Sequence, residues 1–144
     1  MKWNYLKGLI LVFSLSVSNI LLSQKPYLME IKYFDFSMTT DAKIECSEFE
    51  SASEYQTIQI KDSAIIEKTL SFLKAFKKDT IDKYMPDSRA KITIYWINGT
   101  KDVVCISNFG ISYNDAPMLK NQKYIKFIKR VIKSKDAKFD STPN

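Results

Sequence analysis

Apolar residues alternate with polar ones along much of the chain, and this period of two is typical of strands with one buried face. In 42–47, for example, the small or apolar Ala42, Ile44 and Cys46 alternate with polar neighbours. Aromatic and β-favouring residues fill the first predicted strand. Strands are predicted at residues 27–36, 42–47, 55–60, 89–97, 100–107, 110–113 and 117–120.

Two further segments have apolar residues every three to four positions, which predicts amphipathic helices. The first covers 64–78, and Asp62 or Ser63 can cap it because each offers a side-chain oxygen to a free backbone N–H. The second covers 122–134, with Asn121 as its capping residue.

Turn residues separate the later strands. Asn98-Gly99 predicts a hairpin, since both residues tolerate positive φ, and Asn114-Asp115 predicts a second turn. The elements together predict an α+β fold, in which an antiparallel β-sheet carries both amphipathic helices on one face.

The two halves of the chain share a spacing. Cys46 and Cys105 lie 59 positions apart, and the same shift places the first predicted helix on the second. A duplicated unit of two or three strands and one helix accounts for this match, and so does coincidence. Either origin leads to the same fold class.

The N-terminus has the pattern of an export signal. Lys2 and Lys7 are followed by an apolar stretch of 15 residues, 8–22, with no acid before Glu30. A spanning helix needs about 20 apolar residues, so a cleaved secretory signal over 1–23 is favoured over an uncleaved membrane anchor. We expect 24–144 to form a single domain with a tail that frays from about residue 135.

The junction Ser23-Gln24 resembles those in export signals of Bacteroidetes-type Gram-negative bacteria. This resemblance covers the signal alone and implies a periplasmic or secreted protein. Two cysteines in such a compartment favour a disulfide between Cys46 and Cys105, each expected on a strand. Two buried free thiols are the alternative, because cysteine also packs as a small apolar residue.

Composition limits the chemistry of the chain. Its net charge of +6 falls to +4 without the two lysines of the signal, and the charge is uneven, with −4 over 24–62 and +8 over 63–144. The chain has no histidine, which excludes Ser-His-acid triads, Cys-His proteases and His-ligated zinc. Ser71 and Lys74 match a Ser-x-x-Lys motif, but the partner motifs of penicillin-binding proteins are missing. We expect no catalytic residue, no metal and no cofactor.

The second helix carries the candidate binding residues on the arc opposite its apolar face: Lys123, Lys126, Lys129, Arg130 and Lys133. This arc can dock an acidic protein, an anionic lipid or a glycan, or it simply keeps a core helix soluble. A nucleic acid partner is not expected in an exported protein without a known binding motif.

The preferred hypothesis is an exported, non-enzymatic binding domain, an inhibitor- or immunity-type protein acting by protein–protein contact. One alternative is an envelope-associated structural or ligand-binding module that places its basic helix on anionic lipid or glycan. The other is a small enzyme that works without histidine.

Overall fold

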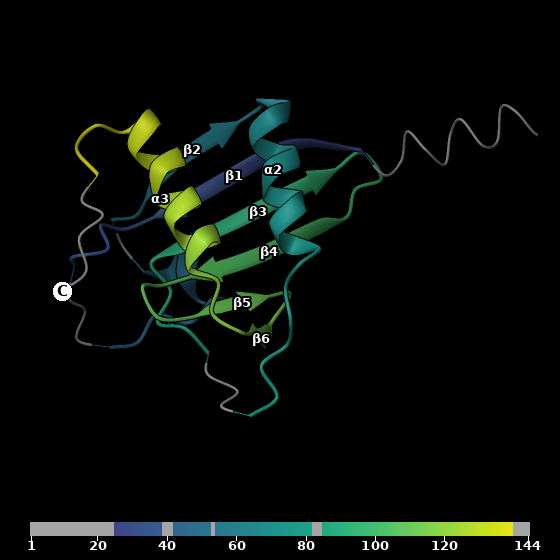
Figure 1. Cartoon of the computed structure of the whole chain (residues 1–144). Coiled ribbons are helices and arrows are strands. Elements are labelled where there is room, and N and C mark those ends of the chain that lie inside the picture. The colour runs from purple at the N-terminus through teal and green to yellow at the C-terminus, as the bar shows by residue number, and fades with distance from the viewer. Residues whose placement is uncertain (1–24, 39–41, 53, 82–84, 140–144) are drawn as a thin grey trace, which may run out of the picture.

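A six-stranded antiparallel sheet carries both long helices on one of its faces (Figure 1). The computed structural model describes residues 25–38, 42–52, 54–81 and 85–139, so the predicted signal over 1–23 lies outside the described residues. The strands, in the spatial order β2-β1-β3-β4-β5-β6, are β1 (Pro26–Tyr33), β2 (Gln56–Ile60), β3 (Ala90–Trp96), β4 (Lys101–Ile106), β5 (Ile111–Tyr113) and β6 (Ala116–Met118). The helices are η1 (Phe49–Ser51), α2 (Ser63–Leu73) and α3 (Gln122–Lys135). The α+β prediction is confirmed.

The main core lies between this sheet face and the two helices. Alternate residues of the central strands, among them Ile31 on β1 and Ile92 on β3, point toward the helices and are fully buried. Ile66 from α2 and Ile128 from α3 pack against them. Alternation therefore assigns one sheet face to the core and leaves the other face with a more polar set of side chains.

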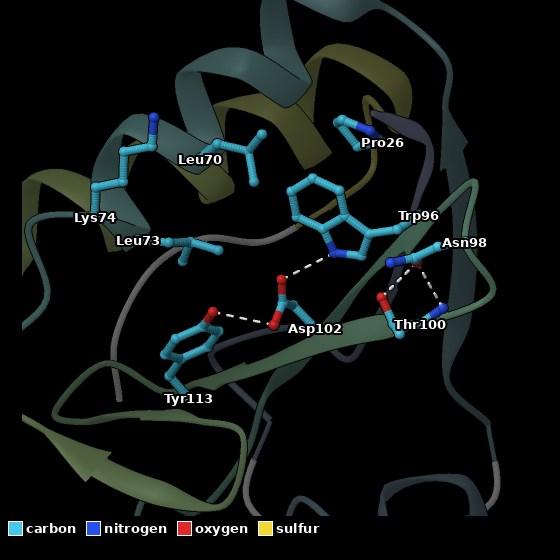
Figure 2. A pocket seen from close by; sticks show the side chains of 9 residues that line it. All are labelled: Pro26, Leu70, Leu73, Lys74, Trp96, Asn98, Thr100, Asp102 and Tyr113. Carbon is cyan, nitrogen blue, oxygen red and sulfur yellow. Dashed lines mark hydrogen bonds between the residues drawn. The ribbon is translucent and has the colours of Figure 1, made fainter. Parts of the chain in front are cut away.

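The predicted caps and turns are present. Asp62 accepts hydrogen bonds from two backbone N–H groups at the start of α2, and Asn121 accepts one from Tyr124 at the start of α3. Gly99 has a φ of +83° in the β3–β4 hairpin, and this hairpin lets Trp96 donate to Asp102 over 2.9 Å (Figure 2).

Asn114 and Asp115 both have positive φ, 46° and 61°, in the turn that joins β5 to β6. Two such residues in a two-residue loop match the twist of the strands that they connect.

The strand predicted over 42–47 is wrong. This segment is a loop, and Cys46 lies at a bend. The backbone N–H of Ile44 donates to the Asp87 carboxylate over 2.8 Å, and the carbonyl of Ile44 accepts from Ser88 over 2.8 Å. These bonds tie the segment to the connection before β3, so it has no place in the sheet.

The first strand and the first helix are both shorter than predicted. β1 ends at Tyr33, and α2 ends at Leu73 instead of residue 78. The chain after α2 runs along the outer edge of β6, where Asp79 donates to the Pro117 carbonyl over 3.0 Å and Leu119 donates to the Lys77 carbonyl over 2.8 Å. Covering this edge strand favours an extended backbone over further helix.

The two halves differ in topology. In the first half, β2 pairs only with β1, whereas in the second half β3 to β6 follow one another in sequence and in space. The shift of 59 places α2 on α3, but it places Cys46, in a loop, on Cys105, in β4.

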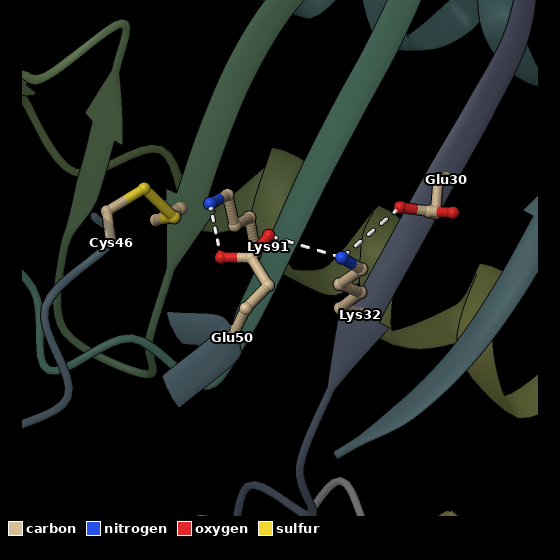
Figure 3. A network of polar contacts seen from close by, with 6 residues as sticks. Glu30, Lys32, Cys46, Glu50 and Lys91 are labelled. Carbon is tan, nitrogen blue, oxygen red and sulfur yellow. Dashed lines mark hydrogen bonds and ion pairs between the residues drawn. A yellow bond between two sulfur atoms is a disulfide. The ribbon is translucent and has the colours of Figure 1, made fainter. Parts of the chain in front are cut away.

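Residues 42–52, which we call the strap, lie on the sheet face opposite the helices. A disulfide joins Cys46 to Cys105, with an S–S distance of 1.97 Å and a Cα–Cα distance of 5.7 Å (Figure 3). Cys105 faces the strap because it alternates with Val104 and Ile106, which belong to the main core. The predicted disulfide is present, although only Cys105 lies on a strand.

Apolar and charged contacts hold the rest of the strap. Phe49 is fully buried, with its ring centroid 5.1 Å from that of Phe34. The Glu50 carboxylate lies 2.8 Å from the Lys91 ammonium and 3.2 Å from the Lys32 ammonium (Figure 3). Burial opposes ionisation of Glu50, but the hydrogen bonds from both lysines outweigh it and lower its pKa.

We expect loss of the disulfide to reduce the free energy of unfolding by about 4 kcal/mol in the chain-entropy model, because the bond closes a long loop. Denaturant unfolding of a Cys46→Ser/Cys105→Ser variant measures the loss. Added reductant should destabilise the wild type and leave the variant unchanged. Two alkylated cysteines in the mass spectrum of the non-reduced protein would contradict the bond.

Glu50→Gln should destabilise the protein at neutral pH by less than about 1 kcal/mol, since the Glu50 side chain is 40% exposed and solvent screens the pairs. The folded-state pKa of Glu50 lies below its ordinary value of 4.5, so this stability is present above pH 4.5 and is lost as pH falls through the folded-state pKa. The measurement is the difference in unfolding free energy between wild type and variant from neutral to acid pH. Glu48→Gln, at an exposed position on the same strap, should change the unfolding free energy at neutral pH by less than about 0.5 kcal/mol. A pH-independent difference for Glu50→Gln would contradict the pairing.

Candidate binding site

A basic hollow lies where α3 passes the loop between β4 and β5. Its volume is about 750 Å³. The side chains that line it are Asn108, Phe109, Lys120, Gln122, Ile125, Lys126, Lys129 and Arg130. Four of these are cationic and none is acidic. The hollow is therefore suited to an anionic ligand.

Helix α3 positions most of these cations. Its apolar residues Tyr124, Ile125, Ile128, Val131 and Ile132 are buried against the sheet. A period of 3.6 residues then turns the lysines and Arg130 outward. Lys133 and Lys135 in the last turn also interact favourably with the negative end of the helix dipole.

Lys129 is the most constrained cation of the basic hollow. Its ammonium donates to the Asn108 side-chain oxygen over 2.6 Å and lies 4.4 Å from the centre of the Phe36 ring. The Asn108 amide nitrogen donates in turn to the Phe36 carbonyl over 3.3 Å. Lys129 thus links the helix to the β4–β5 loop and fixes one wall of the hollow.

Another part of the lining combines an aromatic ring with a second cation. The Phe109 side chain is 63% exposed. The ammonium of Lys120 lies 5.4 Å from the centre of its ring. This pair presents both an apolar surface and a positive charge to a ligand.

The five predicted binding residues do not all line the basic hollow. Lys126, Lys129 and Arg130 line the basic hollow, whereas Lys123 is exposed on α3 outside that lining. The Lys133 ammonium donates to the carbonyls of Ala137 and Phe139 over 2.7 and 2.8 Å.

The segment after α3 is packed further than the sequence predicted. Phe139 is 1% exposed, and its ring lies edge-on to Tyr33 and Phe36, with centroids 5.4 and 5.8 Å apart. Asp136 accepts a hydrogen bond from the Tyr33 hydroxyl over 2.9 Å. Order therefore extends to residue 139, and the rest of the predicted frayed tail lies outside the described residues.

Sequence reasoning missed Asn108, Phe109 and Lys120. They belong to short connections on either side of β5 and β6, and no periodic pattern links them to α3. Phe109 beside Gly110 gives no sign in the sequence of the exposure that the structure shows.

The polar groups of the described residues do not suggest a metal centre, since no three His, Cys, Asp or Glu residues among them group at ligand distance. No helix in the described ranges is long and apolar enough to cross a membrane. Comparisons with models of protein families, with curated proteins and with solved structures found no match to this chain.

A pair of Phe→Ala substitutions should separate core from surface. Phe139→Ala should lower the free energy of unfolding by about 3–5 kcal/mol, the usual cost of truncating a buried phenylalanine. Phe109→Ala should change it by less than about 0.5 kcal/mol, because that ring is mostly in solvent. Denaturant titration of both variants tests this, and equal losses would contradict the packing of Phe139.

Proposed function

We propose that this chain is an exported, non-enzymatic binding domain that acts by protein–protein contact, as inhibitor- or immunity-type proteins do. Its basic hollow receives an acidic segment of the partner. The observation that carries the proposal is the gathering of Lys120, Lys126, Lys129 and Arg130 around a concave surface with no acidic lining residue.

The chemistry of these side chains suits carboxylates. The guanidinium of Arg130 can hold a carboxylate through two parallel hydrogen bonds, and each lysine ammonium offers a further charged donor. The contact between Lys129 and Asn108 holds that ammonium in place before a ligand arrives, which lowers the entropy lost on binding. Exposed Phe109 supplies the apolar contact that many protein interfaces have at their centre.

An acidic protein segment fits the hollow better than a lipid surface does. A helix that lies in a membrane interface needs its apolar face free to enter the acyl layer. The apolar face of α3 is buried in the core of this protein. A membrane would therefore meet the cations and the single exposed ring of Phe109, and the concave shape would limit that contact.

The disulfide supports the exported part of the proposal. Disulfides persist in oxidising compartments and are rare in the cytosol. The Cys46–Cys105 bond, together with the signal pattern of residues 1–23, is consistent with a periplasmic or secreted protein.

Charge reversal tests the proposal. Binding of a glutamate-rich peptide is measured by calorimetry, with the matching glutamine peptide as reference. Lys126→Glu/Arg130→Glu should weaken binding at least about tenfold, a loss of roughly 1.4 kcal/mol. The control is Lys123→Glu/Lys135→Glu, which makes the same change of charge on the same helix but outside the hollow.

The same variants can be used as bait to capture proteins from an extract of periplasm or culture fluid, and the sets of captured proteins are then compared. A specific partner is retained by wild type and control and is lost by the Lys126/Arg130 variant. Equal losses with both variants would show general charge attraction and contradict the hollow. Binding to anionic vesicles or to an anionic polysaccharide, without binding to the glutamate peptide, would favour the envelope-module alternative.

A further inference from the structure

A second cleft lies beside the β3–β4 hairpin, near the end of α2 (Figure 2). Its volume is about 580 Å³, within the usual range for small-molecule sites. Leu70, Leu73, Pro26 and Trp96 supply apolar walls. The Asp102 carboxylate lies between Trp96 and Tyr113 and points into the cleft.

Donors from three parts of the fold hold Asp102 in place. The Trp96 indole N–H donates to its Oδ2 over 2.9 Å. The Tyr113 hydroxyl and the Asn114 amide donate to its Oδ1 over 3.0 and 2.9 Å. An ionised carboxylate has about four acceptor positions, so Oδ2 keeps one for a further donor. Burial and the hydrogen bond to Asp102 raise the pKa of Tyr113, which keeps its hydroxyl protonated.

All three donors are neutral groups. No Lys or Arg nitrogen in the described part of the chain lies within 4.0 Å of Asp102. Lys74 lines the rim of the cleft, but its ammonium points away from Asp102 (Figure 2). Lys101 precedes Asp102 on β4, so alternation places its side chain on the other sheet face.

A fixed negative charge in a half-buried cleft attracts a cation more strongly than the same charge in open water. The surroundings decide which cation. A divalent metal ion needs several oxygen ligands, and Asp102 supplies the only carboxylate in this lining. The apolar walls offer no oxygen ligand to such an ion.

We propose that this cleft binds an organic ammonium ion, a primary amine with a hydrocarbon body. The charged head donates to Asp102 Oδ2, and the body lies against Leu70, Leu73 and Trp96. The Trp96 ring adds cation–π attraction. This site shares no lining residue with the basic hollow. A failure of the ammonium site would therefore not count against the proposed protein partner, and the reverse also holds.

The test compares benzylammonium with benzyl alcohol, which has nearly the same shape without the charge. Trp3, the only other tryptophan, lies in the proposed signal, so the fluorescence of the chain from Gln24 onward reports Trp96 alone. Titration at neutral pH, checked by calorimetry, should show at least about tenfold tighter binding of benzylammonium, or roughly 1.4 kcal/mol. Equal binding of both compounds, or no benzylammonium binding at about 10 mM, would overturn the proposal.

Two variants locate the effect. Asp102→Asn, once its folding is confirmed by thermal unfolding, should weaken benzylammonium at least about tenfold and leave benzyl alcohol unchanged. If that variant does not fold, Lys74→Glu decides: it is exposed, and it should tighten benzylammonium a few-fold. Lys77→Glu is the control outside the lining. Wild-type affinity in folded Asp102→Asn, or equal effects of Lys74→Glu and Lys77→Glu, would contradict the site.

Discussion

The burial of one sheet face beneath two amphipathic helices is the constraint on which the rest of this structure depends. Strand alternation commits Ile31 and Ile92 to that face, and the apolar sides of α2 and α3 close over it. Once the apolar side of α3 is used in this way, its cations have only the solvent side left. The basic hollow is thus a consequence of core packing combined with one neighbouring loop.

The same alternation leaves the opposite face of the sheet in need of a cover of its own. Residues such as Lys32, Lys91 and Cys105 point there, and the helices do not cover them. The strap meets this need with three different interactions: a disulfide, the buried ring of Phe49 and the two-sided ion pairing of Glu50. A short loop with little apolar surface of its own is held mainly by the covalent bond and the buried ring, and the screened ion pairs of Glu50 add a smaller contribution.

The sequence predicted the features that depend on local chemistry. Asp62 and Asn121 cap their helices, and Asn114-Asp115 forms a tight turn, because each acts on backbone groups a few residues away. Local reasoning gave the wrong structure for the loop at Ile44, because the sequence there alternates as a strand does. The loop is held by hydrogen bonds to Asp87 and Ser88, which lie far away in the sequence.

The candidate site divides in the same way. Helical period alone placed Lys126, Lys129 and Arg130 on one side of α3. Asn108, Phe109 and Lys120 could not be added, since only the path of the sheet brings their loops to that helix. Lys133 lies on the same arc, but its ammonium donates to the carbonyl of buried Phe139. That contact depends on the path of the chain after the helix, which the helical period does not predict.

The disulfide also divides the chain into parts that carry load and parts that do not. β2, α2 and β3 lie inside the covalent ring, whereas β1 and α3 lie outside it. When the chain is stretched from its ends, force passes from Cys46 directly to Cys105, at a sequence separation of 59, and bypasses the segment between them. The stretched chain is then shorter by about 200 Å, at 3.3–3.6 Å per residue. The enclosed elements are mechanically sheltered as long as the bond stays oxidised.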